Sequence, residues 1–205
     1  MSDGKVHSQI GASSYYRWRE CPGSVRLCKD VPNISSVYAE EGTKAHELAA
    51  SVLEMGEWPK TFDEEMGEAV QVYVQAVIDD VESISFPRVY IEHKFDLSAI
   101  HPGLYGTADC VIYDEVKKHL IVYDYKHGAG IPVDVANNDQ LMYYGLGALL
   151  SLGIACEKVT LKIAQPRCYH KDGPVREWSF LPIEILDYAA DLKENAMKIR
   201  NKQRS

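Results

Sequence analysis

Apolar positions along the chain follow two different periods. Ala45, Ala49 and Val52 recur at the spacing of one helix face, whereas Val159 and Leu161 alternate with polar residues as in a strand. These patterns predict helices over residues 40–55, 64–84, 137–152 and 182–201, and strands over residues 88–95, 107–113, 119–126, 158–164 and 178–181. The predicted order is helices, three strands, a helix, a strand and helix again.

The N-terminal region predicts two short helices before these elements. Ser13 or Ser14 is expected to cap a helix that runs through Arg19, and Pro22 suits the first turn of a second helix. No Gly/Ser-rich or Pro-rich linker interrupts the sequence. We therefore expect one α/β domain over residues 1–205, with a small mixed sheet flanked by helices. Helices within residues 13–84 lead into its core, and a C-terminal helix covers residues 182–201.

Composition indicates the cellular compartment in which the protein is expected. The 205 residues are 46% hydrophobic, which suits one substantial core, and the five cysteines show no regular framework. The N-terminus carries no apolar run, and the most apolar stretch, residues 146–155, is too short to span a bilayer. These features predict a soluble intracellular protein with reduced thiols and no membrane partner.

The formal net charge of −8 disfavours nucleic-acid binding by bulk electrostatics. A local basic groove can nevertheless coexist with an acidic remainder. Basic residues that could form such a groove lie within residues 17–29, 162–171 and 198–204. The charge therefore leaves a nucleic-acid partner open.

The strand over residues 119–126 ends in a polar pair. Asp124 and Lys126 are two residues apart and therefore share a face, while Tyr125 points to the other. Asp109 interrupts the neighbouring strand, and a hairpin could bring the two carboxylates close together. Two carboxylates suit magnesium or manganese, which can activate water against a phosphate, and a nearby lysine can stabilise the developing charge. A structural Asp–Lys pair beside a turn is the alternative explanation.

Three further motifs surround this tripeptide in a specific order. Gly42-Xaa-Xaa-Xaa-His46 precedes it, Asp109 lies on the strand before it, and Gln140-Xaa-Xaa-Xaa-Tyr144 follows on a predicted helix. Together they resemble the PD-(D/E)XK nuclease superfamily, specifically its RecB-like branch, over residues 40–167. The resemblance implies a restriction-endonuclease-like core of order αβββαβ.

The resemblance also implies roles for the matched residues. Asp109, Asp124 and Lys126 would be catalytic, and both carboxylates would bind metal. His46 and the carbonyl of Tyr125 would be further ligands. Gln140 and Tyr144 would contact the DNA backbone or brace the site, although core packing explains Tyr144 equally well.

Two weaker candidates for site residues lie on or near other predicted strands. Glu92 lies where some relatives carry an additional acidic residue, but a solvent-facing glutamate is an equal alternative. Arg167, at the end of a predicted strand, could reach a substrate phosphate or could be an ordinary exposed arginine. Glu41 is explained by the helix dipole and needs no place in the site.

An iron–sulfur cluster, which some RecB-like nucleases carry, is not expected. Cys21 could supply the first ligand, but only Cys156 and Cys168 follow the last motif, and four thiolates are the usual requirement. The N-terminal Arg17-Trp18-Xaa-Xaa-Cys21-Pro22-Gly23-Ser24 further resembles a phage- or prophage-borne group of this branch.

The leading hypothesis is therefore a magnesium- or manganese-dependent DNA nuclease. An exonuclease serving phage recombination or DNA processing is what the resemblance implies, in the cytoplasm of a bacterial host if the protein is phage-encoded. A homo-oligomer and a phage recombination partner protein are further candidate assemblies. The alternatives are a catalytically silent nuclease-fold module that binds DNA or protein, and a structural α/β domain with a coincidental ion pair.

Overall fold

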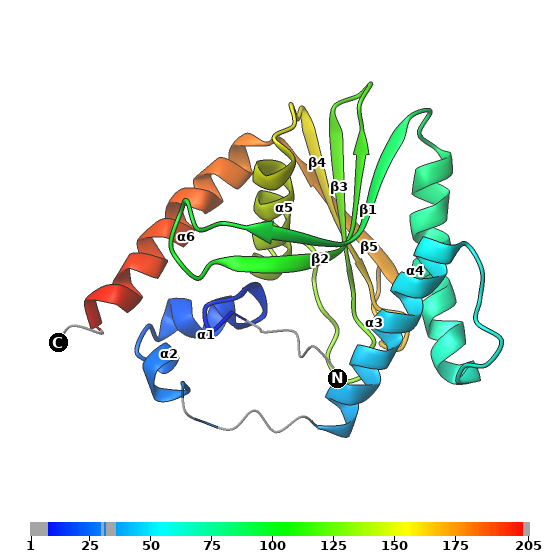
Figure 1. Ribbon diagram of the computed structural model, residues 1–205, viewed down its shortest axis with the longest axis horizontal. Coiled ribbons are helices and arrows are strands. Elements are labelled where there is room, and N and C mark those ends of the chain that lie inside the picture. The colour runs from blue at the N-terminus through cyan, green and yellow to red at the C-terminus, as the bar shows by residue number, and fades with distance from the viewer. Residues whose placement is uncertain (1–7, 30, 32–35, 203–205) are drawn as a thin grey trace.

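A five-stranded mixed sheet forms the centre of the protein (Figure 1). The computed structural model describes residues 8–29, 31 and 36–202. Adjacent strands pair in the order β1-β2-β3-β4-β5, and only the β3–β4 pair is parallel. The strands are β1 (Pro87–Asp96), β2 (Tyr105–Asp114), β3 (His119–Tyr125), β4 (Lys158–Ala164) and β5 (Val175–Phe180). The predicted α/β fold with a small mixed sheet is confirmed.

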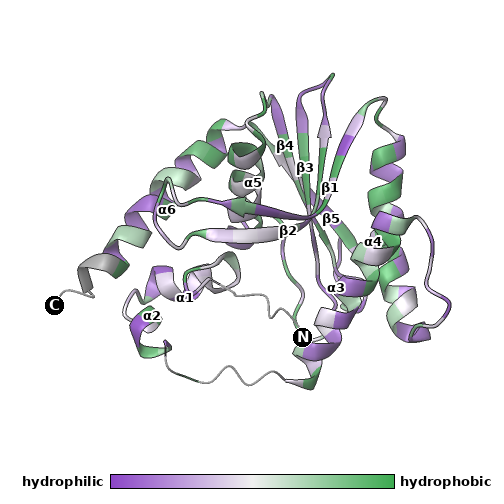
Figure 2. Cartoon of the chain, in the orientation of Figure 1, coloured by the Kyte–Doolittle hydropathy of each residue, from purple (hydrophilic) through white to green (hydrophobic). Residues whose placement is uncertain are grey.

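Helices cover both faces of this sheet. One face packs against α3 and α4, and the other packs against α5, α6 and the N-terminal helices. Their bounds are η1 (Ala12–Ser14), α1 (Tyr15–Glu20), α2 (Ser24–Leu27), α3 (Val37–Met55), α4 (Glu64–Glu82), α5 (Asp139–Leu152) and α6 (Ile183–Lys202). In Figure 2, α4 and α6 alternate between hydrophobic and hydrophilic residues, as helices with one buried face do.

Local capping explains where the long helices begin and end. The side chains of Ser36, Asp63 and Asn138 each accept a hydrogen bond from a backbone N–H in the first turn. Gly56 and Gly153 end α3 and α5 in the left-handed conformation.

Two predictions for the N-terminal helices were wrong. Ser14 precedes α1, but its hydroxyl donates to the carbonyl of Gly11 instead of capping the helix. Pro22 lies in a turn before α2, in which the N–H of Ser24 donates to the carbonyl of Cys21. The local sequence therefore placed Ser14 correctly at the N-cap position of α1 but not the hydrogen bond of its side chain, and it placed the start of α2 too early.

The side chains of β3 alternate between two hydrophobic cores. Val122 packs in the core shared with α5 and α6, whereas Ile121, Tyr123 and Tyr125 pack in the core shared with α3 and α4. This alternation confirms the predicted face assignment. It places Asp124 on the α5 side of the sheet, as expected from its spacing to Val122.

Close packing between α5 and β1 sets the position of the helix that carries Gln140. A Cβ atom added at Gly147 would overlap the ring of Phe95. We therefore expect Gly147→Ala to lower the free energy of unfolding by about 1–3 kcal/mol through overpacking, measured by urea denaturation. Gly42→Ala is the control, because a Cβ there meets open space and should stabilise α3. Equal stabilisation by both substitutions would contradict this packing.

Among the helices of the described residues, none combines the length and apolar character needed to cross a membrane.

Candidate metal centre

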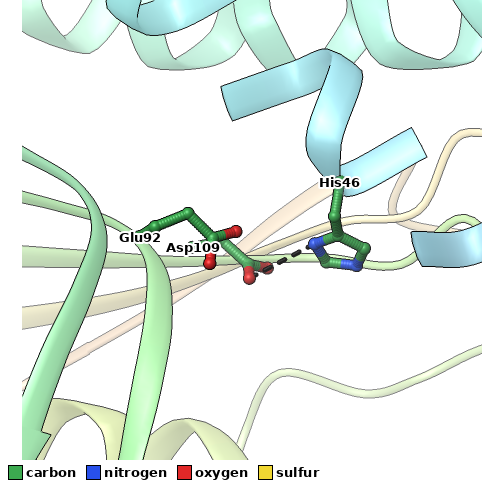
Figure 3. A group of neighbouring side chains, drawn as sticks. All are labelled: His46, Glu92 and Asp109. Atoms are coloured by element: carbon green, nitrogen blue, oxygen red, sulfur yellow. Dashed lines mark ion pairs between the residues drawn. The ribbon is translucent and has the colours of Figure 1, made fainter. Parts of the chain in front are cut away.

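Three side chains from distant parts of the sequence converge beside the end of β3. His46 from α3, Glu92 from β1 and Asp109 from β2 each offer one ligand atom, and these atoms lie within 4.8 Å of one another (Figure 3). His46 Nδ1 lies 3.3 Å from Asp109 Oδ1. The structure therefore brings Glu92, the weakest of the sequence candidates, into the same group as His46 and Asp109.

The backbone of β1 is unusual at this point. Glu92 has a φ of 48°, a left-handed value that a non-glycine residue rarely adopts inside a strand. Register pairs continue on both sides, from Ile91 opposite Cys110 to His93 opposite Ala108. Glu92 is therefore a local irregularity within a paired strand, and its carboxylate lies beside Asp109. Such strain persists only where the surrounding structure enforces it, and it is often found at functional sites.

Asp109 is held in place by two partners. Its Oδ2 accepts a hydrogen bond of 2.7 Å from the backbone N–H of Tyr125, beyond the last β2–β3 register pair, Cys110 with Tyr123. Its Oδ1 faces His46. The carboxylate thus joins β2 to β3 and orients one oxygen toward the group of ligand atoms, with only 15% of its side chain exposed.

A second set of contacts links Asp124 to α5. Lys126 Nζ lies 2.8 Å from Asp124 Oδ2 and donates a hydrogen bond of 2.8 Å to Gln140 Oε1. Gln140 Nε2 then donates to the hydroxyl of Tyr144 at 2.7 Å. Asp124 is almost fully buried, whereas about a quarter of the Lys126 side chain (26%) is exposed. The contacts hold the lysine between the sheet and α5, with part of its side chain still exposed.

The two aspartates have opposite pKa shifts. Burial alone would raise the pKa of Asp109, but His46, the N–H of Tyr125 and Lys126 outweigh burial and lower it. For Asp124, burial and repulsion from Asp109 outweigh the attraction of Lys126, so its pKa is raised. Burial opposes the charging of His46, yet the nearby carboxylates Asp109, Asp124 and Glu92 raise its pKa. The two aspartates, His46 and Lys126 therefore interact electrostatically as one group.

This donor set fits a hard divalent cation. Two carboxylates, Glu92 and Asp109, and the imidazole of His46 converge here, and the Asp124–Lys126 pair lies beside them without joining the group of ligand atoms. Magnesium and manganese prefer carboxylate oxygens, and manganese also accepts imidazole. The chemistry of the residues therefore agrees with the predicted cofactor.

The sequence comparison assigns the chain to a family. A family model described as "Protein of unknown function (DUF2800)" matches residues 7–204. The chain belongs to this DUF2800 family.

Two crystal structures are remotely similar to this DUF2800 protein. A phage related exonuclease from Haemophilus somnus 129PT is 12% identical, with a TM-score of 0.42, and the match covers 96% of this chain and 95% of that one. An alkaline exonuclease from Laribacter hongkongensis is 11% identical, with a TM-score of 0.37 and coverage of 95% and 91%. Because the family description names no activity, the geometry of the metal centre is the evidence for function.

Arg167 lies in a neighbouring network rather than in the metal centre. Its Nη1 donates to Glu41 Oε1 at 2.6 Å and lies 2.7 Å from His127 Nε2, and its Nη2 donates to Glu65 Oε1 at 3.1 Å. The other nitrogen of His127 lies 2.9 Å from the hydroxyl of Tyr125. A phosphate at Arg167 would therefore have to compete with two glutamates.

Sequence reasoning missed His127 and Glu41. Burial lowers the pKa of His127, which favours the neutral ring that can accept a hydrogen bond from Arg167. Glu41 was explained by the helix dipole alone, yet it joins α3 to Arg167 and His127. Proximity in sequence could have pointed to both residues, because His127 directly follows Lys126 and Glu41 lies five residues before His46.

Proposed function

We propose that this chain is a metal-dependent nuclease that hydrolyses phosphodiester bonds of DNA with magnesium or manganese. The convergence of His46, Glu92 and Asp109, beside Asp124 and Lys126, carries the proposal. A divalent cation held there would supply Lewis-acid polarisation of a phosphate oxygen and would ease deprotonation of an attacking water. Asp109 and Asp124 are proposed as its principal ligands, with His46, Glu92 and the carbonyl of Tyr125 completing the set.

Lys126 is proposed to stabilise the charge that develops on the phosphate. An ammonium group has three N–H donors, and two of them face Asp124 and Gln140. The third remains for a phosphate oxygen. Because Gln140 is itself bound to Tyr144, the amino group is oriented before substrate arrives, which is what electrostatic catalysis requires.

The finer parts of the proposal rest on the motif resemblance. They are the RecB-like branch, the exonuclease mode, and a role in phage recombination or DNA processing. Phosphate binding by Arg167 stays a prediction, because its guanidinium already contacts Glu41 and Glu65. Contact of Gln140 and Tyr144 with DNA is secondary to their bracing of Lys126.

The direct test is cleavage together with metal binding. We expect purified full-length protein to degrade linear DNA with magnesium or manganese and to leave it intact in EDTA. Calorimetry should detect binding of manganese alone. At about 100 times the dissociation constant, binding should add roughly 2.7 kcal/mol to stability and raise Tm. Absence of cleavage on single-stranded, double-stranded and nicked DNA with both metals would contradict the nuclease proposal.

A nuclease-fold binding module is the second candidate, and the net charge of −8 favours a protein partner for it, because that charge disfavours binding of nucleic acid by bulk electrostatics. Such a module would still bind DNA or a protein partner but would show no heat on titration with manganese. Metal binding without cleavage would point to an inactive relative that has kept its ligands. The calorimetric experiment therefore separates the two candidates.

A further inference from the structure

Charge is distributed unequally over the helices that cover the two faces of the sheet. Residues 8–29, which contain α1 and α2, carry four basic residues against the single acidic residue Glu20. Helices α3 and α4 together carry ten acidic residues against the single lysine Lys44. The two helical groups contribute to different hydrophobic cores, on opposite faces of the sheet. The chain is thus electrostatically polarised across its sheet.

We propose that the exposed face of α1 and α2, with Arg17, Arg26 and Lys29, binds the phosphate backbone of DNA and leads it to the metal centre. This inference rests on the proposed nuclease function and names the surface that the substrate would use. All three side chains are exposed. Arg19 is excluded, because its guanidinium is engaged by Asp139.

Buried aromatic residues fix the orientation of this face. Tyr15 and Trp18 are almost completely buried, and the Tyr15 ring lies 5.7 Å from the ring of Tyr188 on α6. The buried side of α1 therefore points into the core and leaves Arg17 directed outward. Arg17 therefore projects from a helix whose opposite side is packed in the core.

A short series of contacts connects helix α1, which carries Arg17, to Lys126. Arg19 Nη1 lies 2.7 Å from Asp139 Oδ2, at the first residue of α5. The next residue, Gln140, accepts the hydrogen bond from Lys126. In Figure 1, α1 lies below the sheet on the α5 side, away from α4. DNA on the α1–α2 face would therefore approach Lys126 from the α5 side of the sheet.

Electrostatic attraction favours the α1–α2 side strongly. DNA carries one negative charge per about 1.7 Å of helix axis, so each basic contact releases counterions and each facing carboxylate repels. A local basic face can steer a polyanion even when the whole protein has a net charge of −8. The ten acidic residues of α3 and α4 would disfavour binding of the backbone along the outer surface of these helices.

The test measures DNA binding separately from cleavage. Anisotropy of a labelled DNA duplex would be followed in EDTA over a series of sodium chloride concentrations. Arg17→Ala/Arg26→Ala should weaken binding on the order of tenfold per lost contact at 0.1 M salt, and should flatten the plot of log affinity against log salt by about 0.9 per contact. Arg17→Lys/Arg26→Lys should retain most of the affinity, because it keeps both charges.

A charge-matched control lies at the far end of the sheet. Lys117 and Lys158 are exposed near the beginnings of β3 and β4, whereas Lys126 follows the end of β3. Lys117→Ala/Lys158→Ala should leave affinity and salt slope close to those of the unaltered protein. An equal loss in this control, or no loss in the arginine variant, would overturn the inference. So would failure of the unaltered protein to bind DNA at low salt. Intact binding without cleavage would instead count against the nuclease proposal alone.

Discussion

Asp109→Asn is expected to eliminate manganese binding and to reduce DNA cleavage on the order of a thousandfold. Loss of a ligand that positions a Lewis acid costs several kcal/mol of transition-state stabilisation, and about 1.4 kcal/mol corresponds to each factor of ten. The substituted amide can still accept the hydrogen bond from the N–H of Tyr125, so β2 and β3 should remain joined. Cleavage rate, calorimetry and thermal unfolding of the same preparation would check the result.

A second buried aspartate on β2 provides the control for this substitution. Asp114 accepts hydrogen bonds from the N–H groups of Val116 and Lys117 in the turn to β3, five residues away from Asp109. Asp114→Asn should therefore preserve metal binding and cleavage. If Asp109→Asn kept the manganese affinity of the unaltered protein, the proposed metal centre would be incorrect.

Lys126→Met is expected to reduce cleavage by about 10²–10³-fold while leaving metal binding intact. Methionine preserves the length of the side chain but removes the ammonium group that faces Asp124 and Gln140. Because a cation is then removed from beside Asp124, manganese affinity should be equal or higher. The two measurements together distinguish a group that acts on the phosphate from a group that holds the metal.

Another lysine that is paired with carboxylates serves as the control for Lys126. Lys162 on β4 is also largely buried and contacts Asp80 and Glu177 on the opposite face of the sheet, beside Tyr123. Lys162→Met should lower stability through loss of these ion pairs, but the folded fraction should cleave DNA normally. A Lys126→Met protein that cleaves at the unaltered rate would remove the lysine from the proposed mechanism.

The order of the main elements could be predicted because it depends on local periodicity. Neighbouring residues alone define two of the predicted patterns, and both were confirmed. They are the helical face of Ala45, Ala49 and Val52 and the alternation of Val122 with Tyr123 between the two cores. Boundaries were less accurate, since they depend on partners. For example, β5 begins at Val175, three residues before the predicted strand, because Val175 pairs with Ala164 of β4.

Prediction of the site was uneven for the same reason. Asp124 and Lys126 could be placed on one face from their spacing, and they do contact each other. The role of Glu92 could not be decided, because its position depends on an irregular backbone conformation inside β1. Nor could the partners of Arg167 be found, since Glu41 lies 126 residues away in sequence and meets it only after α3 has packed.

The sequence by itself determined which reactive side chains this protein carries and that Asp124 and Lys126 share a face of the sheet. Both follow from residue type and from the fixed geometry of strands and helices. Only the tertiary structure decided which groups meet. It brought His46, Glu92 and Asp109 together from three separate elements, and it placed the basic α1–α2 segment on the side of the sheet opposite the acidic helices. These arrangements depend on packing between residues that are far apart in the sequence, and a local sequence pattern contains no information on such packing.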